Sequence, residues 1–292
     1  MKTTLRGTQD EIVIGDGLPT VILGERINPT GKKKLAAALV AGDLEIVRQE
    51  ALAQVEAGAD ILDVNVGAAG VDEVKLLPRA VELVLDTVGV PLAIDTADGE
   101  ALAAALAMHQ RVNPEGKPLV NSVNGEEDSL KRVLPLVAKY HTAVIGLCMD
   151  DDGIPDTPES RLAVAKKIVE RAEKHGIGRE DILIDCLALT VGADSRAGWT
   201  TLEAIRIVKE ELGVNTALGA SNVSFGLPDR EHINGAFLAM AIDRGLNCPI
   251  VDAAKVAHYI QAADLALGRD DFAMRYLKAY RKRLKAKAQA AG

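Results

Sequence analysis

Residues Leu218 to Pro228 read LGASNVSFGLP and lie between a short apolar run and a longer segment with helical periodicity. The apolar run, Asn215 to Leu218, is long enough for a buried strand, and Glu231 to Arg244 has the spacing of a helix with an apolar face. A strand that ends in small and amide residues lets a flat ligand approach the backbone, and Asn222 offers such a ligand both a donor and an acceptor. A plain polar loop is the alternative interpretation, because loops are commonly polar.

The same construction recurs along the chain, so that eight apolar runs are each followed by a helical segment. The predicted strands cover residues 20–24, 60–67, 91–96, 117–124, 143–148, 182–186, 215–218 and 250–254. The predicted helices cover residues 35–57, 76–88, 99–109, 128–140, 157–175, 201–212, 231–244 and 255–267. Eight such pairs with short connections predict one α/β domain, a (β/α)8 TIM barrel over residues 20–268. A doubly wound open sheet is the competing arrangement, but the sequence has no Gly-rich nucleotide loop to support it.

Two segments lie outside the predicted barrel. Residues 1–19 form a polar lead-in that has room for a short hairpin closing one end of the fold. Residues 269–292 predict an extra basic helix. Four apolar residues fall on or near one face of this helix: Met274, Leu277, Tyr280 and Leu284. We expect the helix to dock by that face, either on the barrel or on a second subunit.

The composition narrows the class of protein. The chain has 292 residues, of which 48% are hydrophobic and only 3% aromatic, so an aliphatic core of parallel strands covered by helices is favoured. A net charge of -8 argues against binding to nucleic acids or to anionic membranes. No apolar run reaches the roughly 18 residues of a membrane span. Cys148, Cys186 and Cys248 have no paired spacing, which indicates a reducing compartment and predicts a soluble cytoplasmic protein.

Almost every predicted strand ends in an Asp or an Asn. The residues at these ends are Asn28, Asp63, Asn65, Asp95, Asn121, Asn124, Asp185, Asn222 and Asp252. In a TIM barrel the carboxyl ends of the strands converge on the working face, so these side chains should form a ring there. Any one of them could instead be a capping or structural residue, but the ring as a whole predicts a binding site.

The residue types in this ring favour some chemistries over others. His and Cys with the spacing of zinc ligands are missing from the strand ends, and so is a Lys for Schiff-base chemistry. A metal site made by the carboxylates of Asp63, Asp95 and Asp185 is an alternative, but our preferred interpretation has no metal ligands. Carboxylates and amides together suit a flat, neutral heterocycle that is dense in hydrogen-bond donors and acceptors.

Five motifs in this chain resemble those of a known family. They are GERINPTG at Gly24 to Gly31, DVNVG at Asp63 to Gly67, IDTAD at Ile94 to Asp98, NSVNGE at Asn121 to Glu126, and ALGASNVSFGLP at Ala217 to Pro228. The motifs resemble those of the pterin-binding methyltransferases, which include the methyltetrahydrofolate:corrinoid protein methyltransferases and the folate domain of cobalamin-dependent methionine synthase. Dihydropteroate synthase is a more distant relative. The resemblance extends over nearly the whole chain, from residue 20 to about residue 267.

The resemblance implies a site for the pterin of tetrahydrofolate. Three residues match positions that hold the donor and acceptor edge of the pterin: Asp95, Asn121 and Asp185. Four more match positions that line the pocket: Asp63, Asn65, Gly219 and Ser221. Arg230 lies where the family has a polar residue beside the folate. Asn222 matches the amide that hydrogen-bonds to N5, which makes it the predicted catalytic residue.

Two positions depart from parts of the family. Phe225 stands where the stand-alone acetogenic enzymes have Gln, whereas methionine synthase has Phe there. Cys186 follows Asp185 where the acetogenic enzymes commonly have Pro. We interpret Cys186 as a packing residue, because a buried free thiol is commonly inert.

The activity implied by the resemblance is methyl transfer between N5 of tetrahydrofolate and the cobalt of a corrinoid. We expect a partner protein to carry the corrinoid, because this chain lacks the D-x-H-x-x-G signature and a second domain for it. The direction stays open and includes transfer from a methylcorrinoid protein to tetrahydrofolate in demethylation metabolism. A homodimer is favoured by the resemblance. The alternatives are a dihydropteroate synthase, although the seventh strand does not end in a Lys, and a non-catalytic folate-binding subunit that docks a corrinoid protein.

Overall fold

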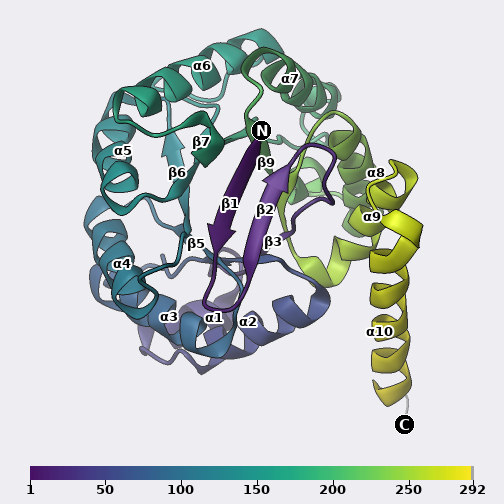
Figure 1. Cartoon of the computed structure of the whole chain (residues 1–292), viewed down its shortest axis with the longest axis horizontal. Helices are drawn as coiled ribbons and strands as arrows, with labels where there is room; N and C mark the ends of the chain where they lie inside the picture. The colour runs from purple at the N-terminus through teal and green to yellow at the C-terminus, as the bar shows by residue number, and fades with distance from the viewer. Residues whose placement is uncertain (291–292) are drawn as a thin grey trace.

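The computed structural model describes residues 1–290 and contains a closed barrel of parallel strands (Figure 1). Around the barrel the strand order is β10-β3-β4-β5-β6-β7-β8-β9, and β10 closes the ring by pairing with both β3 and β9. The strands are β3 (Leu23–Ile27), β4 (Ile61–Val64), β5 (Leu92–Asp95), β6 (Leu119–Asn124), β7 (Ala143–Leu147), β8 (Ile182–Asp185), β9 (Asn215–Gly219) and β10 (Cys248–Val251). The predicted TIM barrel is confirmed.

Helices alternate with these strands and form the outer layer of the barrel (Figure 1). They are α1 (Lys33–Val40), α2 (Glu45–Ala57), α3 (Glu73–Thr87), α4 (Gly99–Val112), α5 (Glu127–Tyr140), α6 (Pro158–Lys174), α7 (Ala197–Leu212), α8 (Arg230–Asp243), α9 (Ala253–Ala266) and α10 (Met274–Ala290). Short 3-10 turns occupy η1 (Arg179–Asp181), η2 (Ala220–Ser224) and η3 (Asp271–Ala273). In α6, Thr157 Oγ1 accepts the Ser160 N–H at 3.1 Å and Pro158 opens the first turn, so local sequence fixes where the helix begins.

The barrel has an inner and an outer apolar core, because alternate residues of each strand point to opposite faces. The inner core contains Leu23, Ile61, Leu119, Ile145 and Leu183, all fully buried. The outer core fills the space between strands and helices with Val, Leu, Ile and Ala side chains. Both faces of every strand are therefore apolar along most of its length, which leaves the strand ends as the place for polar chemistry.

An antiparallel hairpin of β1 (Lys2–Arg6) and β2 (Glu11–Gly15) closes one end of the barrel, as the lead-in segment predicted (Figure 1). Leu5 and Ile14 are fully buried and belong to the inner core. Asn215, the first residue of β9, donates to Thr3 Oγ1 at 2.8 Å and to the Ile14 carbonyl at 3.1 Å. The hairpin therefore covers the amino ends of the strands, and the carboxyl ends form the opposite face.

Several predicted bounds differ from those of the structure by a few residues, and three of the differences have a clear cause or consequence. The single helix over residues 35–57 is two helices, because Gly42 has φ +71 and Asp43 Oδ1 accepts the Glu45 N–H at 2.9 Å to start α2. The first barrel strand runs from Leu23 to Ile27 instead of over residues 20–24. The last strand ends at Val251 because the next residue caps α9.

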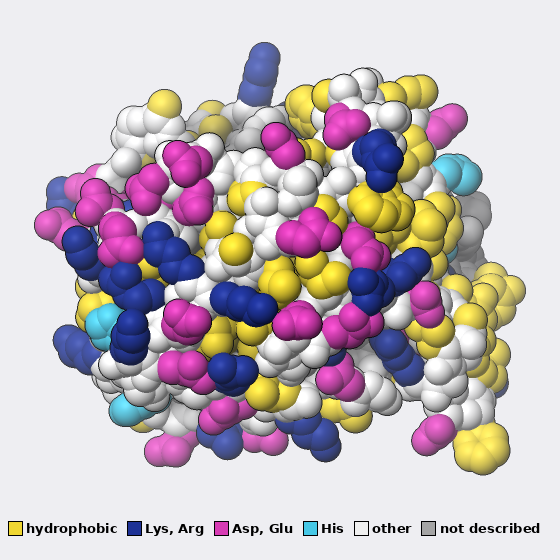
Figure 2. Space-filling model, turned by 90° about the horizontal axis from the view of Figure 1, so that it is seen from above, with side chains coloured by type: hydrophobic (Ala, Val, Ile, Leu, Met, Phe, Trp, Pro, Cys, Tyr) yellow, Lys and Arg dark blue, Asp and Glu magenta, His cyan; other side chains and the backbone are white. Residues whose placement is uncertain are grey.

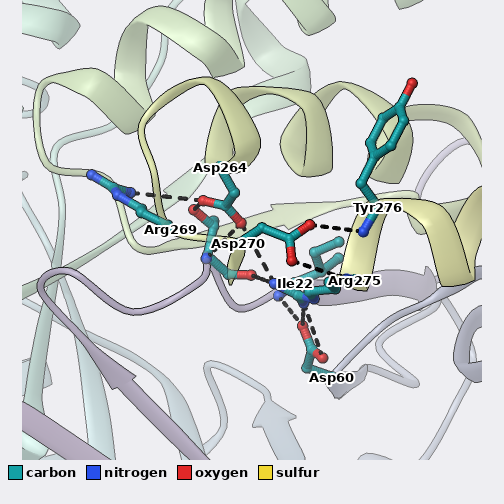
Figure 3. A network of polar contacts seen from close by, with 8 residues as sticks. Ile22, Asp60, Asp264, Arg269, Asp270, Arg275 and Tyr276 are labelled. Carbon is teal, nitrogen blue, oxygen red and sulfur yellow. Dashed lines mark hydrogen bonds and ion pairs between the residues drawn. The ribbon is translucent and has the colours of Figure 1, made fainter. Parts of the chain in front are cut away.

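The C-terminal helix α10 is anchored to the barrel by Arg275 (Figure 3). The guanidinium donates to Asp60 Oδ2 at 3.0 Å and to the Thr20 carbonyl at 3.0 Å, and it lies 3.5 Å from Asp264 Oδ2. Asp270 accepts the backbone N–H groups of Arg275 and Tyr276 at 2.9 and 2.8 Å, and these bonds begin the helix. Burial raises the pKa of both Asp60 and Asp264, and Arg275 opposes this rise.

The predicted docking of this helix on the barrel by its apolar face was wrong. Met274, Leu277, Tyr280 and Leu284 are between 39% and 68% exposed. Ion pairs and hydrogen bonds of Arg275 carry the attachment instead, because the half-buried Asp60 and the buried Asp264 lie within reach of the first turn of α10. Docking of this apolar face on a second subunit, the other predicted possibility, stays a prediction. Residues 291–292 of the predicted basic segment lie outside the described residues.

The surface of the barrel mixes charges of both signs. In the face shown in Figure 2, acidic and basic side chains alternate with apolar ones over most of the molecule. Within residues 1–290, none of the helices has the length and hydropathy needed to cross a bilayer.

Candidate functional site

The predicted polar residues lie at the carboxyl ends of β4, β5, β6, β8 and β9, opposite the hairpin. The strand register places Asp95 beside Asn121 and Asp185 beside Ala217. Three hydrogen bonds then join the strand ends: Asn65 donates to Asp95 (2.9 Å), Asn121 donates across β5 to Asp63 (3.0 Å), and the Gly219 N–H donates to Asp185 (3.1 Å). The structure therefore brings together most of the ring that the sequence predicted.

Asp63 and Asp95 are two acids at neighbouring strand ends, of which Asp63 is buried and Asp95 is half-buried. Asp63 is 1% exposed; its Oδ1 accepts a hydrogen bond from Asn121, and its Oδ2 has no donor among the described residues. Burial, followed by the nearby charge of Asp95, raises the pKa of Asp63 well above its usual value. Burial also raises the pKa of Asp95 to about 6, although the hydrogen bond from Asn65 opposes this. Because two close carboxyl groups resist double ionisation, the pair takes up its first proton more readily than an isolated acid would, and the larger rise in pKa favours Asp63 as the group that holds it.

Asp185 is held by two backbone donors. The Leu187 N–H donates to Oδ1 at 2.7 Å and the Gly219 N–H donates to Oδ2 at 3.1 Å. Burial raises the pKa of Asp185 to about 6, while these two hydrogen bonds and the charge of Arg161 lower it. Each carboxylate oxygen keeps a second lone pair, so Asp185 is a fixed and partly ionised acceptor that can still bind a ligand.

Asn222 lies in the turn η2, which follows β9 directly. A Cβ placed on Gly219 would lie 3.5 Å from Asn222 Nδ2, so the amide sits over the end of the strand. Its side chain is exposed and makes no hydrogen bond within the described part of the chain. Asn222 thus presents a free donor and acceptor next to the residue that holds Asp185.

Arg230, the first residue of α8, supports this turn from outside. It donates to the Ser221 carbonyl at 2.7 Å and to Ser224 Oγ at 3.0 Å, and its guanidinium lies 5.9 Å from the centre of the Phe225 ring. Phe225 itself is 67% exposed. The structure therefore assigns Arg230 a role in holding η2, while its predicted contact with the folate stays a prediction.

Glu25 is a further member of this site that was not predicted from the sequence. Glu25 Oε1 accepts a hydrogen bond from Asn28 Nδ2 at 2.9 Å, and Lys32 Nζ donates to the Arg26 and Asn28 carbonyls, each at 3.0 Å. Burial raises the pKa of Glu25 and lowers the pKa of Lys32. The charge of Glu25 contributes to the raised pKa of both Asp63 and Asp95, so Glu25 belongs to the same group of acids at the strand ends. Glu25 was not predicted because the first strand was expected to end at residue 24, whereas β3 continues to Ile27.

Two members of the predicted ring have capping roles. Asn124 Oδ1 accepts the Glu126 N–H at 3.0 Å at the start of α5. Asp252 Oδ1 accepts the Ala254 N–H at 3.2 Å and the Gln54 amide at 3.0 Å, which caps α9. The capping alternative that the sequence left open therefore applies to these two residues.

The three cysteines are buried, as expected for packing residues. Burial and contact with Cys148 raise the pKa of Cys186, and burial raises the pKa of Cys248, so these thiols stay protonated. Within residues 1–290 no group of three or more His, Cys, Asp or Glu side chains is arranged to hold a metal ion.

Comparisons with known proteins agree with this geometry. A family model described as pterin binding enzyme matches residues 24–252. The chain is 31% identical over 271 residues to a methylcorrinoid:tetrahydrofolate methyltransferase of Eubacterium limosum, which covers 89% of this chain and 96% of that protein. It is 33% identical over 255 residues to the methionine synthase of Mycobacterium leprae (strain TN), covering 82% of this chain but only 20% of that protein.

A similar barrel is found among solved structures. The dihydropteroate synthase of Yersinia pestis with a pterine-sulfa conjugate aligns with a TM-score of 0.67 and 18% sequence identity, over 92% of this chain and 100% of that chain. At this identity the likeness concerns the fold alone.

Proposed function

The chain belongs to the pterin-binding enzyme family, and we propose that it is a methyltransferase acting between N5 of tetrahydrofolate and the cobalt of a corrinoid on a partner protein. The direction we propose is from the methylated corrinoid protein to tetrahydrofolate. This direction is supported by the name of the Eubacterium limosum relative, which is similar over nearly its whole length. The observation that carries the proposal is the side-chain amide of Asn222, which makes no hydrogen bond among the described residues. It lies in the turn directly after β9, and the last residue of β9, Gly219, donates its N–H to Asp185.

In this proposal the fixed acceptors of the site bind the flat edge of the pterin. Ionised Asp95 and Asp185 would accept its N–H groups, because a carboxylate can take two parallel hydrogen bonds. Asn121 keeps its carbonyl oxygen for the ligand while its amide nitrogen is bonded to Asp63. The remaining pocket-lining residues of the proposal are Asp63, Asn65, Gly219, Ser221 and Arg230. Because these bonds already exist without a ligand, little ordering is needed on binding.

The methyl transfer forms one N–C bond and breaks one Co–C bond. The N5 lone pair takes the methyl group, the electron pair of the Co–C bond stays on the cobalt, and N5 releases its proton. We assign Asn222 the hydrogen bond to N5. In the reverse direction the methyl group moves from N5 to the cobalt and N5 gains a proton, so the hydrogen bond from Asn222 to N5 strengthens. Since both directions share one transition state, this bond stabilises it in either direction.

Two adjacent loops give the proposed pocket an apolar rim for the corrinoid partner. The Val191 N–H donates to the Val223 carbonyl at 2.9 Å and Thr190 Oγ1 donates to the Phe225 carbonyl at 2.7 Å, so the loops after β8 and β9 are joined. Leu189 and Phe225 are exposed on these joined loops. A corrin ring has wide apolar faces, and we propose that this rim receives it. A homodimer in a reducing, cytoplasmic setting completes the proposal.

Dihydropteroate synthase is the second enzyme that this fold could serve. The solved structures support the fold only, and the turn after β9 reads ASNVS and contains no lysine. A folate-binding subunit without turnover is the alternative from another class of protein. The methyltransferase and each of these two alternatives predict different results in one series of assays.

The test follows the corrin absorbance with purified protein. One mixture contains tetrahydrofolate and methylcob(III)alamin, and the other contains methyltetrahydrofolate and cob(I)alamin. We expect methyl transfer in both mixtures and its loss in Asn222→Ala, while Asn124→Ala serves as a matched amide control at a capping position. Tetrahydrofolate binding without turnover, even with a corrinoid protein, would support the binding subunit. Condensation of a pterin with aminobenzoate would support the dihydropteroate synthase instead.

A further inference from the structure

Arg161 on α6 is the bulkiest side chain that the fold buries completely, with 1% of its surface exposed. It forms no ion pair among the residues that the structure describes. Burial lowers the pKa of its guanidinium, but an arginine stays charged under these conditions. A buried cation without a bound carboxylate is costly to the fold, because its lost hydration is not repaid by an opposite charge. Its position therefore needs another explanation.

The hydrogen bonds of Arg161 go to the loops that surround Asp185. Nη1 donates to the Cys186 carbonyl at 2.9 Å, to the Leu187 carbonyl at 2.8 Å and, at 3.3 Å, to Thr201 Oγ1. Nε donates to the Pro155 carbonyl at 2.9 Å. One guanidinium thus joins the loop before α6 to the two residues that directly follow Asp185.

Leu187 links this guanidinium to the site. Its φ of +60° lies in the left-handed region, which a Leu rarely adopts. In this conformation the Leu187 N–H points at Asp185 Oδ1, at 2.7 Å, while its carbonyl accepts from Arg161 and, at 3.0 Å, from Thr201 Oγ1. The strained backbone needs a fixed partner on its carbonyl side, and Arg161 supplies it.

We propose that Arg161 is a positioning residue for the pterin site, which holds Leu187 so that its N–H orients Asp185 and which places a positive charge behind that carboxylate. This inference rests on the proposed function, because it assigns Asp185 to pterin binding. The group that acts on the ligand is Asp185, and Arg161 acts through it.

The other groups around Asp185 do not supply this charge. Cys186 follows it directly after β8, Cys148 follows β7, and Cys248 on β10 is close enough for the charge of Asp185 to affect it. The pKa of Cys186 and of Cys248 is raised, so these thiols are neutral. Asp156 is also negative and acts on Arg161 itself. Loss of the guanidinium should therefore make Asp185 harder to ionise.

The test measures tetrahydrofolate affinity as a function of pH in three variants. Arg161→Met should move the pH midpoint of binding upward by about one unit, the lower end of the effect of a nearby opposite charge on a carboxyl pKa. Arg161→Lys should keep the midpoint and weaken binding roughly tenfold, because an ammonium cannot reach three carbonyls at once. Arg275→Met is the matched control: it removes another anchored guanidinium at the far end of the barrel and should leave both quantities unchanged.

An unchanged midpoint in Arg161→Met would overturn the proposal. If Arg161→Met does not fold, wild-type affinity in Arg161→Lys would overturn it equally. A second readout separates this inference from the proposed function: the pKa of Asp185 in the free protein, followed by carboxyl 13C NMR and assigned with Asp185→Asn. Absence of tetrahydrofolate binding in the wild-type protein would contradict the proposed function, whereas an upward pKa shift in Arg161→Met would still support the role of Arg161.

Discussion

Asn65 donates a hydrogen bond of 2.9 Å to Asp95 Oδ2, which joins the loop after β4 to the end of β5. Asn121 on β6 makes the corresponding bond of 3.0 Å to Asp63 at the end of β4. Each of these two acids is thus oriented by an amide from another strand or from the loop that follows it. The polar face of the barrel is consequently fixed before any ligand arrives, and its protonation state is set by burial.

Tetrahydrofolate affinity should depend on pH. Burial raises the pKa of Asp95 and of Asp185 to about 6, and the proposed pterin contacts require the ionised form. Affinity should be constant above pH 7 and fall as the pH drops through 6, by about tenfold per pH unit for each proton taken up. A calorimetric titration from pH 5 to 8 measures this, and affinity that increased on acidification would contradict the assignment.

Asp63→Asn should be well tolerated. An Asn can accept from Asn121 with its oxygen and donate to Asp95 with its nitrogen, as a protonated Asp63 would. The pKa of Asp63 is higher in the folded protein than in the unfolded chain, so the folded protein binds this proton more tightly. The resulting contribution to the free energy of unfolding is therefore lost as the pH rises from about 4. Relative to wild type, Asp63→Asn should therefore gain stability over that range.

Urea unfolding of both proteins at several pH values tests this account of Asp63. Asp63→Ala is the matched control, and it should cost about 1–3 kcal/mol, because the Asn121 amide is left without its acceptor. Equal losses in Asp63→Asn and Asp63→Ala would show that Asp63 is ionised in the folded protein.

Asn222→Ala should lower the rate of methyl transfer far more than it weakens folate binding. The proposed bond to N5 is strongest in the transition state, so its loss should reduce kcat by about tenfold or more and change the Kd for tetrahydrofolate only slightly. Single-turnover rates and equilibrium titrations measure the two effects separately. Equal losses in rate and affinity would reduce Asn222 to a binding residue.

Arg275→Met should loosen the C-terminal helix. The change leaves the half-buried Asp60 and the buried Asp264 without their main cation, and because both Asp60 and Arg275 are partly exposed, the cost should lie below the roughly 3–5 kcal/mol of a fully buried pair. We expect a lower thermal midpoint and faster proteolysis within α10. Arg281→Met, on the exposed side of the same helix, is the control and should behave like the wild type. If both variants resist proteolysis to the same degree, other contacts hold the helix.

The barrel could be predicted because its signals are local. Aliphatic runs alternate with helical periodicity eight times, and parallel strands in this arrangement close in one way. The break at Gly42 was missed, since apolar residues on both sides keep the helical period through it. The docking of α10 on the barrel by its apolar face could not be predicted for a different reason. Periodicity identifies a helix, but it does not say whether a neighbouring element covers its apolar face.

The site could be predicted only in part. Residues at strand ends, such as Asp95 and Asp185, follow from the fold. Whether a particular end residue binds a ligand or caps a helix depends on where its side chain points, which is why Asn124 and Asp252 belonged to the predicted ring. The role of Arg161 depends on contacts among loops distant in sequence, and no local pattern could show it.

Transfer of an isotope-labelled methyl group tests the central claim most directly. The protein is incubated with tetrahydrofolate and methylcob(III)alamin that carries a 13C methyl group, and 13C NMR locates the label. We predict that the label moves from cobalt to N5 with the wild-type protein, and that Asn222→Ala slows this transfer strongly. Label that stays on cobalt, together with no detectable binding of tetrahydrofolate, would contradict the account.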